Sequence, residues 1–83
     1  MSTKEKLIER FKRLPKDFTF DELTRLFGYL GFKLDNKGAT SGSRVRFRRG
    51  EESLTLHKPH PGNIMKEKSL LDIYIYLTMK GLL

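Results

Sequence analysis

The segment TSGSRVRFRRGEESLTLHKPHPG, residues 40–62, contains two stretches in which polar and apolar side chains alternate. Successive side chains of a β-strand point to opposite faces, so each stretch predicts a strand with one apolar face. Gly50, Glu51 and Glu52 separate the two stretches and have the character of a turn. The segment therefore predicts a β-hairpin.

The two faces of this predicted hairpin differ in chemistry. If the strands pair, Val45, Phe47, Leu54 and Leu56 form an apolar face that belongs to the core. The opposite, open face carries Arg44, Arg46, Arg48, Thr55 and His57. We therefore expect a sheet with a basic surface.

The chain has 83 residues, no cysteine and a formal net charge of +7. This length suits one domain, residues 1–83, that folds without disulfides. Without cysteine there is no thiolate metal site. The start of the chain has no apolar signal-peptide region, and no run approaches the roughly 18 apolar residues of a membrane span. We expect a soluble, cytoplasmic protein.

The positive charge favours a polyanionic partner, because Lys and Arg side chains that neutralise phosphates release counterions. The plain alternative is a solvated surface that is merely basic. Four arginines fall between residues 44 and 49. This concentration favours nucleic acid or an acidic protein as the partner.

Two amphipathic helices are predicted before the hairpin. In Lys4–Leu14 the apolar residues recur at helical spacing, and Pro15 ends the pattern. Its charged side is interpreted as a solvent face rather than a second basic binding face. A helix over Phe20–Leu30 begins with the capping-box pair Thr19 and Glu22. Gly31 is placed for its left-handed C-terminal cap.

A short strand is predicted over residues 32–35, followed by a Gly-, Asn- and Ser-rich loop over 36–42. This loop lacks the Lys-Ser/Thr ending of a phosphate-binding P-loop and the helix that would follow. The segment 57–62 contains two prolines, which exclude regular structure. Its two histidines, with no cysteine or nearby carboxylate pair, do not predict a metal site.

The last segment, residues 67–83, has strand-like composition at 72–77, but its length favours a helix. Ser69 could cap its start and Gly81 its end. The helix would be apolar on more than one side, which implies either deep burial or a docked partner. Burial in the protein's own core is the default expectation. The order helix, helix, strand, strand, strand, helix predicts an α+β fold with a three-stranded antiparallel sheet and helices packed on one face.

Four features in order resemble the HicA family, the toxins of bacterial and archaeal toxin–antitoxin pairs. They are the helix ending in Gly31-Phe32, GSRVRF at 42–47, LHKPHPGN at 56–63 and a last helix closing on Gly81-Leu82-Leu83. The similarity covers about residues 18–83 as a HicA-like core. Residues 1–15 then form an N-terminal helical extension.

The resemblance implies a double-stranded-RNA-binding-like fold, cleavage of messenger RNA and inhibition by a HicB-type antitoxin. We expect no cofactor. The family motif usually places a histidine, held to be catalytic, directly after Gly-Ser. In this chain that position is Arg44. Arginine stays protonated near neutral pH and cannot act as a general base.

RNA cleavage without a metal needs a base for the ribose 2′-hydroxyl, a cation for the phosphorane and an acid for the leaving oxygen. Histidine is the side chain suited to proton transfer near neutral pH. The catalytic candidates are therefore His57, as base or acid, and Arg44, which with Arg46 would hold the scissile phosphate. Candidate RNA-binding residues are Ser43, Arg46, Arg48, Lys58 and His60.

Three functions remain open from the sequence. The first is a small ribonuclease toxin neutralised by a protein that covers the basic sheet. The second is a non-catalytic RNA-binding module of the same fold. The third is an interaction subunit whose basic face meets an acidic protein.

Overall fold

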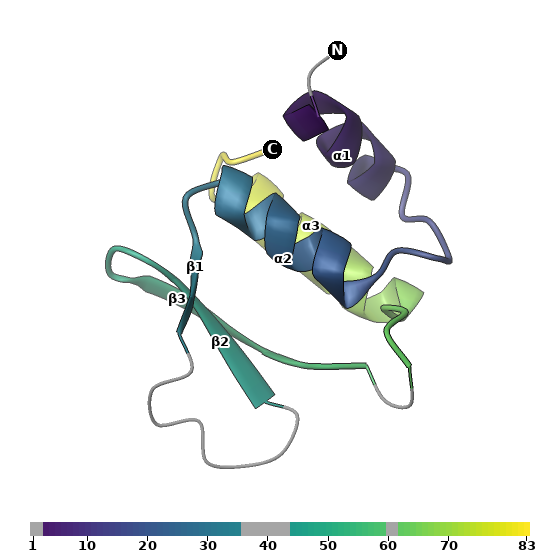
Figure 1. Cartoon of the computed structure of the whole chain (residues 1–83). Coiled ribbons are helices and arrows are strands. Elements are labelled where there is room, and N and C mark those ends of the chain that lie inside the picture. The colour runs from purple at the N-terminus through teal and green to yellow at the C-terminus, as the bar shows by residue number, and fades with distance from the viewer. Residues whose placement is uncertain (1–2, 36–43, 60–61) are drawn as a thin grey trace.

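The computed structural model describes residues 3–35, 44–59 and 62–83 (Figure 1). The elements are α1 (Thr3–Lys12), α2 (Phe20–Tyr29), β1 (Lys33–Asp35), β2 (Arg44–Arg49), β3 (Glu52–His57) and α3 (Glu67–Met79). Their order and types are those predicted. The loop predicted over residues 36–42 lies outside the described ranges.

The three strands form one antiparallel sheet in the order β1-β2-β3. Figure 1 places all three helices on one side of this sheet, so the predicted α+β fold is confirmed. In the hairpin, Val45 is opposite Leu56 and Phe47 is opposite Leu54. Val45 and Phe47 are buried as predicted, whereas the two leucines on the edge strand β3 are only partly buried.

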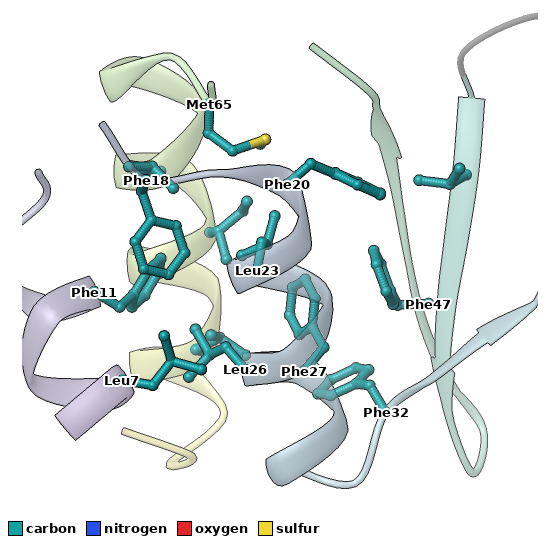
Figure 2. Packing of buried hydrophobic residues seen from close by; sticks show 14 residues of the cluster. Leu7, Phe11, Phe18, Phe20, Leu23, Leu26, Phe27, Phe32, Phe47 and Met65 are labelled. Atoms are coloured by element: carbon teal, nitrogen blue, oxygen red, sulfur yellow. The ribbon is translucent and has the colours of Figure 1, made fainter. Parts of the chain in front are cut away.

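Aromatic rings form the centre of the core and connect the sheet to the helices (Figure 2). Phe47 on β2 lies against Phe27 on α2, with ring centroids 4.5 Å apart. Phe20, at the start of α2, also approaches Phe47, with its centroid 6.3 Å from that of Phe47. Phe32, just before β1, is 5.1 Å from Phe27. These rings hold the apolar face of the hairpin on α2.

Helix α1 belongs to the same core. Its Leu7 and Phe11 are buried, and Phe11 lies 5.6 Å from Phe18 and 6.1 Å from Tyr74 of α3 between ring centroids. The helix ends at Lys12 rather than at the predicted Leu14. Leu14, which precedes Pro15, leaves the helical geometry and has a positive φ of 50°, which is uncommon for a residue other than glycine.

The ends of α2 have the predicted chemistry. The amide of Glu22 donates to the Thr19 hydroxyl at 3.1 Å, and the amide of Thr19 donates to the Glu22 carboxylate at 3.0 Å. At the other end Gly31 has φ +93°, and the amide of Phe32 donates to the carbonyl of Phe27 at 2.8 Å. This pairing is the Schellman arrangement, in which a left-handed glycine lets the chain turn sharply into β1.

Helix α3 confirms the helical interpretation of the last segment, but Ser69 does not cap it. The helix begins one turn earlier, and its N-cap is Lys66 in an extended conformation with no side-chain capping bond. The C-terminal prediction is confirmed. Gly81 has φ +74°, and the amide of Leu82 donates to the carbonyl of Leu77 at 2.9 Å.

The expectation that the core buries all apolar sides of α3 is wrong. Leu70, Ile73 and Leu77 are buried, but Leu71, Ile75 and Met79 form a second stripe that is exposed. The second stripe lies away from the core because α1, α2 and the sheet cover only one face of the helix. No helix in the described part of the chain has the length and apolar character that crossing a membrane requires.

Arg10 joins α1 to the start of α2. Its guanidinium donates to Glu22 at 2.8 Å and to the Asp17 side chain at 3.0 Å, and it lies over the Phe18 ring. The hydrogen bond from Arg10 lowers the pKa of Glu22 below its ordinary value, against the opposing effect of partial burial. The same hydrogen bond raises the pKa of Arg10. Glu22 thus serves both the capping box and the contact between the helices.

Phe11→Ala tests whether α1 is packed on the core. The substitution removes a fully buried ring, and changes of this kind cost about 3–5 kcal/mol. We expect urea denaturation to give a free energy of unfolding lower by about that amount. Lys12→Ala, at the exposed neighbouring position, should change it by less than about 0.5 kcal/mol. An equally small loss for Phe11→Ala would contradict this packing.

Glu22→Gln tests the ionic part of the Arg10 contact, because glutamine keeps the capping-box pattern. At pH 7 the wild type should be more stable by about 1 kcal/mol, as expected for a partly exposed charge-assisted hydrogen bond. A carboxylate whose pKa is lowered by folding contributes stability above its unfolded pKa. The difference should therefore shrink as the pH falls from about 4.3, the ordinary glutamate value, through the lower pKa of folded Glu22.

The matched control is Glu51→Gln, which neutralises an exposed carboxylate in the hairpin turn. Chemical denaturation at several pH values measures both variants against the wild type. A stability difference for Glu22→Gln that does not change between pH 7 and pH 2.5 (roughly two units below the ordinary glutamate pKa) would rule out the ionic contribution.

Candidate nucleic-acid interface

The register of the hairpin places five predicted side chains on its open face. Arg44 is directly opposite His57, and Arg46 is directly opposite Thr55. Arg48 follows on the same face, opposite Ser53. The three arginines and His57 were predicted as site residues, and all four side chains are exposed. The structure thus brings Arg44, Arg46, Arg48 and His57 together on one surface.

Directly opposite residues of an antiparallel pair have Cβ atoms about 4.5–5.5 Å apart, and diagonal neighbours are roughly 7–8 Å apart. His57 therefore has Arg44 as its direct neighbour and Arg46 as its diagonal neighbour. The Arg and His side chains are long enough at these spacings to converge on a single phosphate. This cluster of His57, Arg44 and Arg46 is called the basic triad below.

The short strand β1 adds two residues that the sequence analysis did not identify. Lys33 is opposite Arg48 and Asp35 is opposite Arg46, so both lie on the open face. The Asp35 carboxylate accepts from Arg48 at 3.3 Å. The alternation in residues 32–35 indicates that Lys33 and Asp35 share one face of a strand. Only the pairing of β1 with β2 shows that this face is continuous with the open face of the hairpin. Asp35 partly neutralises the end of the sheet at Arg48.

Within the basic triad, Arg46 is opposite Asp35, but the ion pair of that carboxylate at 3.3 Å is with Arg48. Arg44, Arg46 and His57 have no hydrogen-bond or ion-pair partner among the residues that the structure describes. Arg44 and Arg46 are like charges on the same face of β2 and repel each other, so an anion that contacts both relieves their repulsion. The triad end of the face is therefore the part best suited to bind a phosphate.

The segment after β3 is tied to the start of α2. The amide of Phe20 donates to the carbonyl of Asn63 at 2.8 Å, and the amide of Met65 donates to the carbonyl of Phe18 at 2.7 Å. Lys58 extends over the Phe20 ring, with its Nζ 5.7 Å from the centroid. These contacts hold residues 63–65 against the start of α2 and keep Lys58 beside the end of β3 that carries His57.

Two of the predicted RNA-binding residues, Ser43 and His60, lie outside the described ranges. Their proposed roles stay predictions. Across residues 3–35, 44–59 and 62–83, no three His, Cys, Asp or Glu side chains are grouped so as to hold a metal ion. The predicted site therefore consists, in its described part, of cations and one imidazole on an exposed sheet.

A groove of about 320 Å³ adjoins the open face at the edge of β3 that is not paired with β2. It lies between β3 and α3, and His57 is among its lining residues. A smaller hollow of about 190 Å³ shares His57 and also has Lys58 and Lys66 in its lining. The open face and the groove thus meet at His57. Sequence reasoning did not find the groove, because it requires the relative placement of two distant elements.

Comparison with known proteins gives one match. A family model described as the HicA toxin of bacterial toxin–antitoxin matches residues 20–79. A search of curated proteins and a search of solved structures found no match. The matched residues include α2, all three strands and α3, and exclude α1. Because the match covers most of the chain, including the whole basic face, this protein belongs to the HicA family of toxins of toxin–antitoxin systems.

Proposed function

We propose that this HicA-family toxin is an mRNA interferase, an endoribonuclease that binds and cleaves messenger RNA on the open face of its sheet. The observation that carries the proposal is the basic triad. Two unpaired arginines and an exposed imidazole share one end of the hairpin, with Arg44 directly opposite His57. The positive net charge of +7 supports attraction of a polyanion.

The proposed reaction uses side chains and one water molecule. His57 takes the proton of a ribose 2′-hydroxyl, and the resulting oxygen attacks the adjacent phosphorus. The O2′–P bond forms as the P–O5′ bond breaks, and the protonated His57 returns its proton to O5′ through a water molecule. Arg44 and Arg46 contact the non-bridging oxygens, where negative charge increases in the phosphorane. The products are a 2′,3′-cyclic phosphate and a 5′-hydroxyl.

The remaining cations position the strand in this proposal. Arg48 and Lys58 contact flanking phosphates, with Ser43 and His60 contributing from residues beyond the described ranges. Such contacts fix the register of the nucleic acid without reading its sequence. Arg48 contributes less charge than Arg46, because Asp35 already pairs with it at 3.3 Å.

Membership of a toxin–antitoxin family implies an antitoxin partner. We propose that this partner is of the HicB type and that it covers the basic face, where acidic or polar side chains would compete with RNA for the triad. Inhibition would then require no change in the toxin's fold.

A second function is favoured by one specific residue. Arg44 occupies the position that a histidine usually has in the motif this chain resembles, and arginine cannot accept a proton near neutral pH. A toxin without that histidine could retain the fold and its basic face as a non-catalytic RNA-binding module. The two functions differ in whether His57 supports cleavage.

His57→Ala decides between them. Proton transfer by a positioned side chain contributes about 10²–10⁴-fold in rate, so the purified variant should cleave single-stranded RNA at least about 100-fold more slowly. Ser53→Ala, on the same strand and the same face, is the matched control and should retain cleavage. Both assays contain EDTA, since the proposed step needs no metal. Unchanged cleavage by His57→Ala would eliminate its catalytic role.

Arg46→Ala tests the phosphate contact separately from cleavage. We measure binding to 2′-O-methylated RNA, which lacks the attacking hydroxyl, at several salt concentrations. Loss of one phosphate contact should weaken binding and reduce the slope of log K against log salt by roughly 1. Arg13→Ala removes the same charge from the exposed surface of the helical layer and should leave the slope unchanged. Equal slopes for the two variants would place RNA elsewhere on the molecule.

A further inference from the structure

The groove between β3 and α3 has an apolar floor. Leu54 and Leu56 come from the core side of β3, Met65 comes from the residues just before α3, and Ile73 comes from the middle of α3. Its volume of about 320 Å³ is at the lower end of the range for small-molecule sites, which is about 300–1,000 Å³. The space therefore suits a single planar ring system rather than a larger ligand.

The rim of the groove on α3 is polar. Ser69 and Asp72 both line it, and residues three apart on a helix are neighbours on one face. The side chains of Ser69 and Asp72 have no hydrogen-bond or ion-pair partner within the described ranges. For Asp72 this is notable because the chain carries 17 Lys and Arg. A hydroxyl and an acceptor-only carboxylate thus stand side by side beside an apolar floor.

We propose that this groove is a subsite for one unpaired guanine base of the bound RNA. The inference rests on the proposed function, because it takes the RNA to be bound on the neighbouring basic face. It adds to that function the recognition of an unpaired guanine in the substrate. Arginine–phosphate contacts position a strand, whereas hydrogen bonds to base edges carry the sequence information.

The rim matches the Watson–Crick edge of guanine. That edge presents an acceptor, O6, next to two donors, N1–H and the 2-amino group. The Asp72 carboxylate can accept from both donors at once, and the Ser69 hydroxyl can donate to O6. Adenine and cytosine present one amino donor beside a ring-nitrogen acceptor, which would face the carboxylate unfavourably. Uracil presents one N–H donor between two carbonyl acceptors.

The apolar floor serves the flat face of the base. Unpaired bases that leave a strand are held by stacking on aromatic or apolar side chains while their Watson–Crick edges are read. Leu54, Leu56 and Ile73 supply such a surface. The Met65 thioether adds a polarisable contact of the kind that favours aromatic rings.

The groove is in reach of the scissile phosphate. His57 lines both the groove and the smaller hollow beside it, and it is directly opposite Arg44. A nucleotide whose phosphate contacts the basic triad can therefore place a neighbouring base across the end of β3. Lys58 and Lys66 line the adjoining hollow and can contact the next phosphate.

The test uses a short 2′-O-methylated oligouridine with one central guanine, and the same oligomer with inosine, which lacks only the 2-amino group. Binding is measured by fluorescence anisotropy for the wild type and for Asp72→Asn. The wild type should bind the guanine oligomer about 5-fold or more tightly than the inosine oligomer. Asp72→Asn should bind the two within about 2-fold, since the amide offers a single acceptor.

Glu9→Gln is the matched control. It neutralises an exposed carboxylate on α1, away from the groove, and should keep the wild-type preference for guanine over inosine. Thermal melting confirms that each variant is folded. Equal binding of guanine and inosine by the wild type would overturn the subsite, as would full discrimination by Asp72→Asn.

Two further results separate this inference from others. Guanine discrimination that depends on Asp72, together with no cleavage of unmodified RNA, would overturn the proposed enzymatic function and support the subsite. If Asp72→Asn instead weakens binding of the antitoxin and leaves base discrimination unchanged, the groove is a protein-docking site and the proposal is overturned.

Discussion

The packing of Phe47 against Phe27, with ring centroids 4.5 Å apart, fixes the orientation of the hairpin on α2. Because side chains alternate along a strand, the burial of Phe47 and Val45 forces Arg44, Arg46 and Arg48 to the opposite face. A shift of one residue in register would bury arginines and expose phenylalanine, which is prohibitively unfavourable. The apolar contact inside the molecule therefore determines where its positive charge lies.

That charge is arranged unevenly. Arg48 pairs with Asp35, which lies opposite Arg46 in the sheet, whereas Arg44, Arg46 and His57 have no hydrogen-bond or ion-pair partner in the described part of the chain. Two arginines on the same face of one strand repel each other and do not stabilise the free fold. Their repulsion is relieved by a bound anion, so the same arrangement that slightly weakens the free protein favours anion binding. The groove beyond β3 adds an apolar surface and the Asp72 carboxylate, which we propose bind a base.

Local signals predicted most of the fold. The capping box at Thr19 and Glu22, the glycine caps and the alternation in β2 and β3 each depend on a few adjacent residues, and the structure confirms them. The errors have tertiary causes. The start of α3 was misplaced because Ser69 resembles a cap, and the exposed stripe at Leu71 and Ile75 depends on how many elements cover the helix. Asp35 and the groove at Asp72 required the sheet order and the placement of α3.

Our central proposal is that the basic triad gives this HicA-family chain ribonuclease activity, although Arg44 stands where the motif that the chain resembles usually has a histidine. Its most direct test is induced expression of the toxin alone in a bacterial host, with growth and total messenger RNA followed together. The wild type should arrest growth and deplete messenger RNA, and an Arg44→Ala, His57→Ala double variant expressed at the same soluble level should do neither. Normal growth with intact RNA for the wild type, or arrest that persists in the double variant, would contradict the account.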